Sequence, residues 1–334
     1  MLRSMYSAIS GMNAFQTELD VVGNNIANVD TVGFKASRTE FSDILSQTLS
    51  NASNPGPTAG VGGTNSQQVG LGVNISAIYT PFTQGADQET GVPTDVALNG
   101  DGFFLVSNNI QSSEPAPGSA DDAVVTQTNT VGTGAVGGTA SPVFYTRNGQ
   151  FSVDANGNIV LPDGSKLLGN VYNASGGTQP PTVASPTSLN AVNVNIRDAA
   201  GQVVQGQFTI SPQGQITVTD PTNGQYVETW SVPLANFSNP SGLNKVGDNL
   251  YAATPNSGNA YAAVGAAPPT AYIGTAGVNG FASMQVGALE ASNVNLTNEF
   301  SNMIVAQQAF DANSKVINTD NNILTTVLGL ENQA

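Results

Sequence analysis

Apolar residues recur at helical spacing at both ends of the chain. Near the N-terminus the spacing alternates between three and four residues along a stripe made of Met5, Ala8, Met12, Phe15, Leu19, Val22 and Ile26. This unbroken a/d pattern predicts a helix over residues 1–28 whose stripe packs against another helix. Asn28 and Gly33 tolerate positive φ, so we expect the helix to stop there.

A second stripe near the C-terminus repeats every seven residues, at Leu296, Met303, Phe310, Ile317 and Leu324. The accompanying half of this seam holds Phe300 and Leu328 and is polar between them. The pattern predicts a helix of about 35 residues, or about 50 Å. Ser292 or Asn295 is expected to cap its start. Packing of both stripes against a β domain is an alternative, but long a/d seams favour a helix–helix interface.

Between the helices the chain is rich in turn residues. Residues 41–70 contain NPGP at 54–57 and GVGG at 60–63, which predicts an extended linker. Farther on, short apolar runs such as FFLV at 103–106 and IVL at 159–161 are bounded by turn dipeptides. These Asn-Gly and Asp-Gly pairs, typical of antiparallel hairpins, begin at Asn99, Asp101, Asn148, Asn156, Asp163 and Asn223. Stretches at about 112–142 and 173–204 are rich in small and turn residues and read as insertions.

The pattern therefore predicts an α+β protein. Long N- and C-terminal helices, within residues 1–40 and 290–334, form an α-helical coiled-coil domain. A linker over 41–70 leads to a central antiparallel all-β domain over 71–289, sandwich-like or barrel-like. Isolated helices of this length are marginal in water, so each stripe needs a partner, either the other stripe or a neighbouring copy.

Composition removes most catalytic chemistry. The 334 residues include 8 Lys and Arg against 23 Asp and Glu, a net charge of −15, which argues against a nucleic-acid partner. The chain has no His and no Cys, so thiolate, His-dependent and zinc–cysteine mechanisms are excluded. No apolar run approaches 18 residues, so no membrane insertion is expected.

The remaining motifs carry no clear chemistry. DANGN at 154–158 superficially resembles a calcium loop, but its glycine is misplaced, so a hairpin turn is the better interpretation. The glycine-rich segments lack the residues of phosphate and dinucleotide loops. The carboxylates are scattered rather than paired, so no glycosidase is indicated. An enzyme, a metal site and a cofactor are not expected.

The order of several motifs identifies a resemblance. The N-terminal part carries SGMN at 10–13, LDVVGNNIAN at 19–28 and TVGFK at 31–35. The middle carries GDGFF at 100–104 and YTRNGQF at 145–151, and the C-terminal part carries GALEASNV at 287–294 and MIVAQQAF at 303–310. With these motifs the chain resembles the flagellar rod and hook family of axial proteins. The family motif near the N-terminus includes Asn24, Asn25, Ala27, Asn28, Gly33, Phe34 and Lys35.

The resemblance implies a structural subunit of the flagellar hook, a curved tube that transmits torque from rod to filament. A distal rod subunit is the alternative, and a secreted β-rich adhesin is a remote one. In this family the terminal helices line the inner tube and the β domain forms outer layers. The implied partners are further copies in a helical homopolymer, rod, hook-cap and hook–filament junction proteins, and the type III export apparatus. The implied location is the extracellular flagellum.

Overall fold

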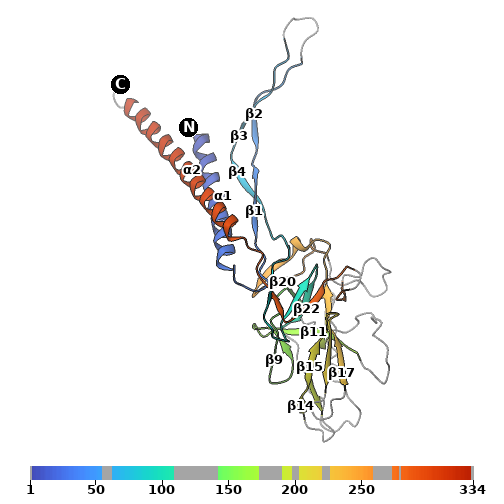
Figure 1. Ribbon diagram of the computed structural model, residues 1–334. Coiled ribbons are helices and arrows are strands. Elements are labelled where there is room, and N and C mark those ends of the chain that lie inside the picture. Colours follow the sequence, from blue (N-terminus) through green and yellow to red (C-terminus); the bar gives the residue numbers. More distant parts are fainter. Residues whose placement is uncertain are drawn as a thin grey trace. The chain divides into compact units, whose positions relative to one another are not determined.

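The computed structural model describes residues 2–54, 62–108, 142–172, 190–197, 203–219, 226–258, 273–277 and 280–331 (Figure 1). The chain divides into two compact units, each assembled from segments that are far apart in sequence. Unit 1 comprises Met1–Val29, Ala36–Pro81 and Val294–Ala334. Unit 2 comprises Asp30–Lys35 and Phe82–Asn293.

Unit 1 contains the two predicted helices, α1 (Leu2–Ala27) and α2 (Leu296–Glu331), which lie side by side and antiparallel (Figure 1). Asn295 caps α2, because its Oδ1 accepts hydrogen bonds from the backbone N–H groups of Thr297 and Asn298 at 3.1 and 3.3 Å. Gly33 has a φ of +68°, as expected beyond the end of α1. Asn28 does not adopt a positive φ, because its N–H still bonds to the Asn24 carbonyl as in a helix.

An antiparallel ribbon completes unit 1, and each of its two sides consists of two consecutive strands. Its strands are β1 (Arg38–Asp43), β2 (Ser46–Ser50), β3 (Gln67–Gly70) and β4 (Val73–Tyr79). β1 pairs with β4 and β2 with β3, both antiparallel, and β2 and β3 continue the direction of the first pair (Figure 1). The linker predicted over 41–70 is therefore a paired ribbon in its described part. Local composition did not reveal this, because strand pairing joins residues that are far apart in the sequence, such as Ser46 with Gly70 and Phe41 with Ile75.

Unit 2 is built from antiparallel strands. Its first half contains β5 (Asp87–Glu89), β6 (Val96–Asn99), β7 (Phe103–Ser107), β8 (Phe144–Thr146), β9 (Ser152–Val153), β10 (Ile159–Val160), β11 (Lys166–Tyr172), β12 (Asn190–Ala191) and β13 (Asn195–Arg197). Its second half contains β14 (Val203–Gln205), β15 (Gln207–Ile210), β16 (Gln215–Thr219), β17 (Tyr226–Ser231), β18 (Pro233–Ala235), η1 (Pro240–Gly242), β19 (Asn244–Gly247), β20 (Leu250–Ala252), β21 (Ile273–Thr275), β22 (Ser283–Val286) and β23 (Ala288–Glu290).

The largest sheet of unit 2 runs in the order β15-β16-β17-β11-β7-β8-β20-β19, with further short strands attached to it. This confirms the predicted central antiparallel β region. Within the described strands the sheet ends at β15 and β19 and does not close into a barrel. The insertions predicted at 112–142 and 173–204 lie outside the described residues, apart from residues 142, 190–197 and 203–204.

The core of unit 2 lies on both faces of β7. Phe104 and Val106 belong to one buried apolar cluster, while Phe103 and Leu105 belong to a second. Successive side chains of a strand point to opposite faces, so a strand buried on both sides has a continuous apolar sequence. This explains the run of four apolar residues at 103–106.

The turn dipeptides predict some connections correctly and others wrongly. Asn156 and Asp163 begin the turns that join β9 to β10 and β10 to β11, and both pairs are hydrogen-bonded hairpins. The turns at 99–102 were also expected to form a hairpin, but β6 pairs with β22 whereas β7 pairs with β8, β11 and β18. Gly100 and Gly102, with φ of +113° and +155°, lead the chain from one sheet to the other. No hairpin forms at Asn148 either, and Asn223 lies outside the described residues.

Candidate functional site: the helix pair and a buried ion cluster

Polar and small residues line part of the contact between α1 and α2. Three facing pairs, seven or fourteen residues apart on each helix, are Ser4–Asp320, Gly11–Asn313 and Asn25–Glu299. The Ser4 hydroxyl donates to Asp320 Oδ2 at 2.6 Å, and Asn25 Nδ2 donates to Glu299 Oε2 at 3.3 Å. At Gly11 a Cβ atom would lie 2.8 Å from Asn313 Nδ2, so glycine permits the close approach. Such polar layers specify one lengthwise register of the two helices, which apolar contacts alone specify less well.

The predicted apolar stripes contribute only in part to this contact. Ala8 and Val22 are buried, whereas the other stripe residues of α1 are half-buried, namely Met5, Met12, Phe15, Leu19 and Ile26. On α2 the half-buried members are Met303, Phe310, Ile317 and Leu324. Leu296, the first residue of the seven-residue repeat, is 39% exposed. Phe300 and Leu328 of the predicted companion half are exposed by 49% and 57%, so that half of the seam is displaced by one position. Glu299, Ala306, Asn313 and Asp320 occupy that half.

This displacement has a simple origin. The companion residues on α2 are acidic, amide or small, and a search for apolar periodicity passes over them. α1 also has a second neighbour, because the Phe15 ring lies 5.5 Å from the Phe41 ring of β1. The half-buried stripe of α1 therefore serves two contacts.

Asn25 joins three segments of unit 1. Its side chain is 1% exposed, donates to the Ser37 carbonyl at 2.8 Å and accepts from the Ser37 N–H at 3.0 Å. With its bond to Glu299, it fastens the end of α1 to the start of β1 and the first turn of α2. The neighbouring motif residues Asn24 and Ala27 are exposed, and the Asn28 side chain donates to the Asn24 carbonyl at 2.9 Å.

The outer surface of unit 1 is unusually apolar. Of the 18 large hydrophobic residues that are exposed in the described part of the chain, all but Val92 and Val246 belong to unit 1. The 16 are Tyr6, Ile9, Phe41, Ile44, Leu45, Leu49, Val69, Ile78, Leu296, Phe300, Ile304, Val305, Val316, Ile323, Val327 and Leu328. Concentrated exposed apolar surface marks an interaction site.

An open pocket of about 350 Å³ in unit 1 is lined by residues of α1, α2 and β1 and their flanks, including Glu18, Arg38 and Asn302. Burial raises the pKa of Glu18, because the charged carboxylate loses hydration. Among the described residues no ion pair engages Glu18.

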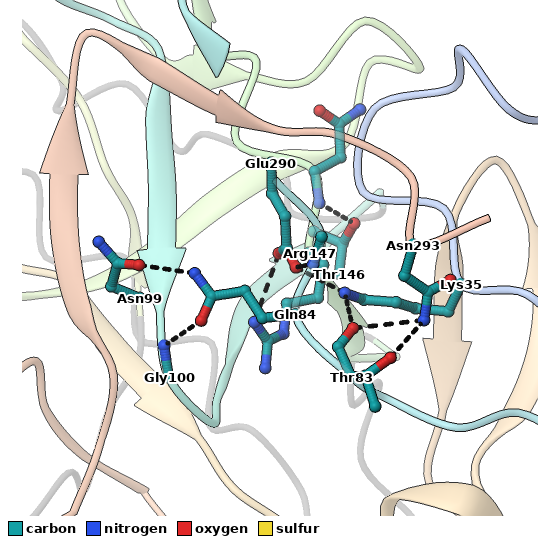
Figure 2. A network of polar contacts seen from close by, with 11 residues as sticks. Lys35, Thr83, Gln84, Asn99, Gly100, Thr146, Arg147, Glu290 and Asn293 are labelled. Carbon is teal, nitrogen blue, oxygen red and sulfur yellow. Dashed lines mark hydrogen bonds and ion pairs between the residues drawn. The ribbon is translucent and has the colours of Figure 1, made fainter. Parts of the chain in front are cut away.

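Unit 2 contains a buried ion cluster centred on Glu290 (Figure 2). Glu290 Oε1 lies 2.5 Å from Lys35 Nζ, and Oε2 lies 3.3 Å from a guanidinium nitrogen of Arg147. Oε1 also accepts the Gly85 N–H at 3.0 Å. The three charged side chains are at most 2% exposed. They join residues from three distant parts of the sequence.

Opposing effects act on the charges of this cluster. Burial lowers the pKa of Lys35, while the Glu290 carboxylate acts in the opposite direction by favouring the ammonium form. Arg147 also lies over the Phe103 ring, with 5.4 Å between the guanidinium carbon and the ring centroid. Removing one member of a buried ion pair costs about 3–5 kcal/mol, because the partner charge is left uncompensated.

The rest of the GFK motif packs around the cluster. The Gly33 N–H donates to the Glu290 carbonyl at 2.8 Å, and a Cβ atom on Gly33 would lie 2.9 Å from the Arg147 backbone carbon. Lys245 Nζ donates to the Lys35 carbonyl at 2.9 Å and lies 4.8 Å from the Phe34 ring centroid. The motif of residues 24–35 thus divides between two tasks, one at the end of α1 and one inside unit 2.

Sequence reasoning missed Glu290 and Arg147 as site residues. Their signal was indirect, since the chain is only 9% charged and each lies beside an apolar stretch. The arrangement of both sites binds chain segments together. Over the described ranges no three His, Cys, Asp or Glu side chains gather as metal ligands. No helix among those residues has the length and apolarity needed to cross a membrane.

Family profiles match three parts of the chain. The profile described as "Flagella basal body rod protein" matches residues 5–35, and "Flagellar hook protein FlgE/F/G D1 domain" matches residues 135–218. The profile "Flagellar basal body rod FlgEFG protein C-terminal" matches residues 285–330. Lys35, Arg147 and Glu290 each fall in a different one of these segments.

Full-length relatives agree with the profiles. The flagellar basal-body rod protein FlgG of Bacillus subtilis (strain 168) is 38% identical over 331 residues, covering 99% of this chain and 100% of the relative. The protein of the same name from Agrobacterium fabrum is 30% identical, covering 98% of each chain. The flagellar hook protein FlgE of Treponema pallidum is 28% identical over 479 residues, covering 99% of this chain and 100% of the relative.

A substitution at Asn25 tests the polar junction of unit 1. We expect Asn25→Leu to destabilise the junction by about 2 kcal/mol, because Ser37 and Glu299 lose buried hydrogen-bond partners. Amide hydrogen exchange at Ser37 in the folded full-length chain should then accelerate roughly thirtyfold. Asn24→Leu, at the exposed neighbouring position, is the control and should leave this rate unchanged. Equal effects of the two substitutions would contradict the role of Asn25.

The Glu18 pocket predicts a pH dependence. The raised pKa means that folded unit 1 favours protonated Glu18, so ionisation costs stability as the pH rises above the ordinary value of 4.5. Glu18→Gln should therefore raise the melting temperature of the helical circular dichroism signal at neutral pH. This gain should shrink as the pH falls toward 4.5. Asp20→Asn, at an exposed position, is the control, and a gain for Glu18→Gln that is independent of pH would refute the explanation.

Proposed function

Because this chain belongs to the flagellar rod and hook protein family, we propose that it is a subunit of the basal-body rod that assembles with further copies of itself through unit 1. The observation that carries this proposal is the concentration of exposed apolar side chains on unit 1. An isolated chain leaves this surface in water, and a helical polymer buries it.

The assembly surface has two parts. On α2, Leu296, Phe300 and Ile304 are spaced by four residues and form one exposed stripe. On the ribbon, Ile44, Leu45 and other apolar residues are exposed, and a lone two-stranded ribbon is marginally stable in water. Each Å² of apolar surface buried contributes about 25 cal/mol, so packing against neighbouring copies stabilises both parts.

The comparisons support a rod subunit over the hook subunit that the sequence motifs favoured. The relatives named FlgG that are cited above align along essentially their whole length at 30–38% identity. The hook relatives of Treponema pallidum and Borreliella burgdorferi reach 28% and 27% across longer alignments of 479 and 456 residues. A hook subunit is the second candidate, favoured by the full-length Treponema match and by the D1-domain profile.

Membership of the family also supports proposals about the location, the neighbouring proteins and the export route of the chain. As a rod component the chain works outside the cytoplasm, in contact with neighbouring rod and hook proteins, after passage through the type III export apparatus. Its role is structural. The core of unit 2, which lies on both faces of β7, provides a stiff body. The helix pair of unit 1 provides the polymer contacts through which torque passes between subunits.

Substitution on the exposed stripe tests assembly directly. Phe300→Asp places a charge on the proposed interface without disturbing a buried side chain, since Phe300 is 49% exposed. We expect the purified chain to keep the folded unit 2 but to lose polymerisation, as measured by sedimentation and electron microscopy. Val246→Asp, at a position 53% exposed in unit 2, is the matched control and should assemble normally. Normal polymers from the Phe300 variant would overturn the proposed surface.

Location distinguishes rod from hook. Antibody against unit 2, applied to isolated hook–basal bodies, is expected to label the rod after the surrounding rings are removed. A deletion strain should lack the structures beyond the rod, because a rod subunit precedes them in the assembly. Labelling along the curved hook, with the rod intact in the deletion strain, would replace the rod proposal with the hook alternative.

A further inference from the structure

Three of the chain's passages between the units end side by side within unit 2. The chain crosses between units after Lys35, before Phe82 and after Asn293, as well as after Val29. Lys35 Nζ donates to the Thr83 carbonyl at 2.8 Å, and Asn293 Nδ2 donates to Thr83 Oγ1 at 3.0 Å (Figure 2). The Asn293 N–H donates to the Phe34 carbonyl at 3.4 Å. The segments 30–35, 82–85 and 290–293 are therefore hydrogen-bonded to one another.

Glu290 is the residue that these segments share. Its carboxylate accepts from Lys35 on the first segment, from Gly85 on the second and from Arg147, which directly follows β8. Its backbone carbonyl accepts the Gly33 N–H. One side chain at the end of β23 thus holds the segments on which the chain enters and leaves unit 2.

We propose that Glu290 is a positioning residue that couples these three segments, so that they open and close as one cooperative unit. A pull applied to one passage is then shared by all three before any segment separates. The coupling is a property of the single chain. Its mechanical benefit, distributing torque at the root of the connections, rests on the proposed function.

Charge suits this role better than apolar packing. An apolar cluster of the same volume is often as stable as a buried ion cluster, so stability alone does not require these residues. A carboxylate accepts several directed hydrogen bonds at once, which apolar groups do not. Here those bonds come from Lys35, Gly85 and Arg147. The geometry therefore serves alignment of the segments.

Native-state hydrogen exchange on the full-length, unassembled chain tests the coupling. Three amides serve as probes, those of Gly33, Gly85 and Asn293, and only Gly85 bonds to the carboxylate itself. In Glu290→Gln we expect all three amides to exchange at least about tenfold faster and by similar factors, and β7 amides to accelerate only as far as the lowered stability of unit 2 requires. Acceleration confined to Gly85 would overturn the proposal, because the carboxylate would then act only locally.

Two further variants separate coupling from stability. Glu290→Gln is expected to lower the denaturant midpoint reported by the fluorescence of Trp230, the only tryptophan, because Lys35 and Arg147 lose their counter-charge. The triple variant Lys35→Met, Arg147→Met and Glu290→Met removes all three charges together and is expected to restore that midpoint. Its three probe amides should still exchange faster, by unequal factors. Restored protection at all three amides would show that the cluster is merely structural and refute the proposal. This variant keeps the test decisive if Glu290→Gln does not fold.

Glu299→Gln changes a buried carboxylate of unit 1, so it is the control and should leave the exchange of the three probe amides unchanged. Because no polymer is involved, the outcome does not depend on the rod assignment.

Discussion

Antiparallel closure of the two chain ends is the constraint on which the rest of the molecule depends. Unit 1 exists only when α1 meets α2, and unit 2 is fastened only when residues near position 35 meet residues near position 290. Such closure has a modest entropic cost, since loop entropy grows slowly with length, but it is slow to form because the contacts are non-local. The polar layers of the helix pair and the ion cluster then fix the alignment in which closure occurs.

Unit 1 buries several polar side chains and exposes many large apolar ones. Asn25, Glu299 and Asp320 are buried, while Phe300, Ile304 and Leu45 are exposed. A buried polar group is tolerated when its hydrogen bonds are made, and those of Asn25 and Asp320 are. Within the part of the chain that the structure describes, the exposed apolar side chains are not covered. Under the proposed function, the internal contacts of unit 1 select its geometry and its exposed apolar surface supplies the free energy of assembly.

Charged residues are scarce in this chain, and several of them gather at the ion cluster. The chain has 8 basic residues, and three of them, Lys35, Arg147 and Lys245, lie in or beside the cluster. Both ion pairs found among the described residues share Glu290. Buried ion pairs are poor sources of net stability, so their concentration at the point where the chain enters and leaves unit 2 favours a role in alignment.

The sequence by itself determined the elements that local geometry controls. The seven-residue repeat located both helices, Asn295 was among the two expected caps, and the turns at Asn156 and Asp163 identified two hairpins. The order of short motifs identified the family. Only the tertiary structure decided that Glu299 and Asp320 complete the seam, that residues 46–50 pair with 67–70, and that Lys35 meets Glu290. The reason is physical: periodicity and turn chemistry act within a few residues, whereas these contacts are made by side chains and strands whose meeting depends on how the whole chain packs.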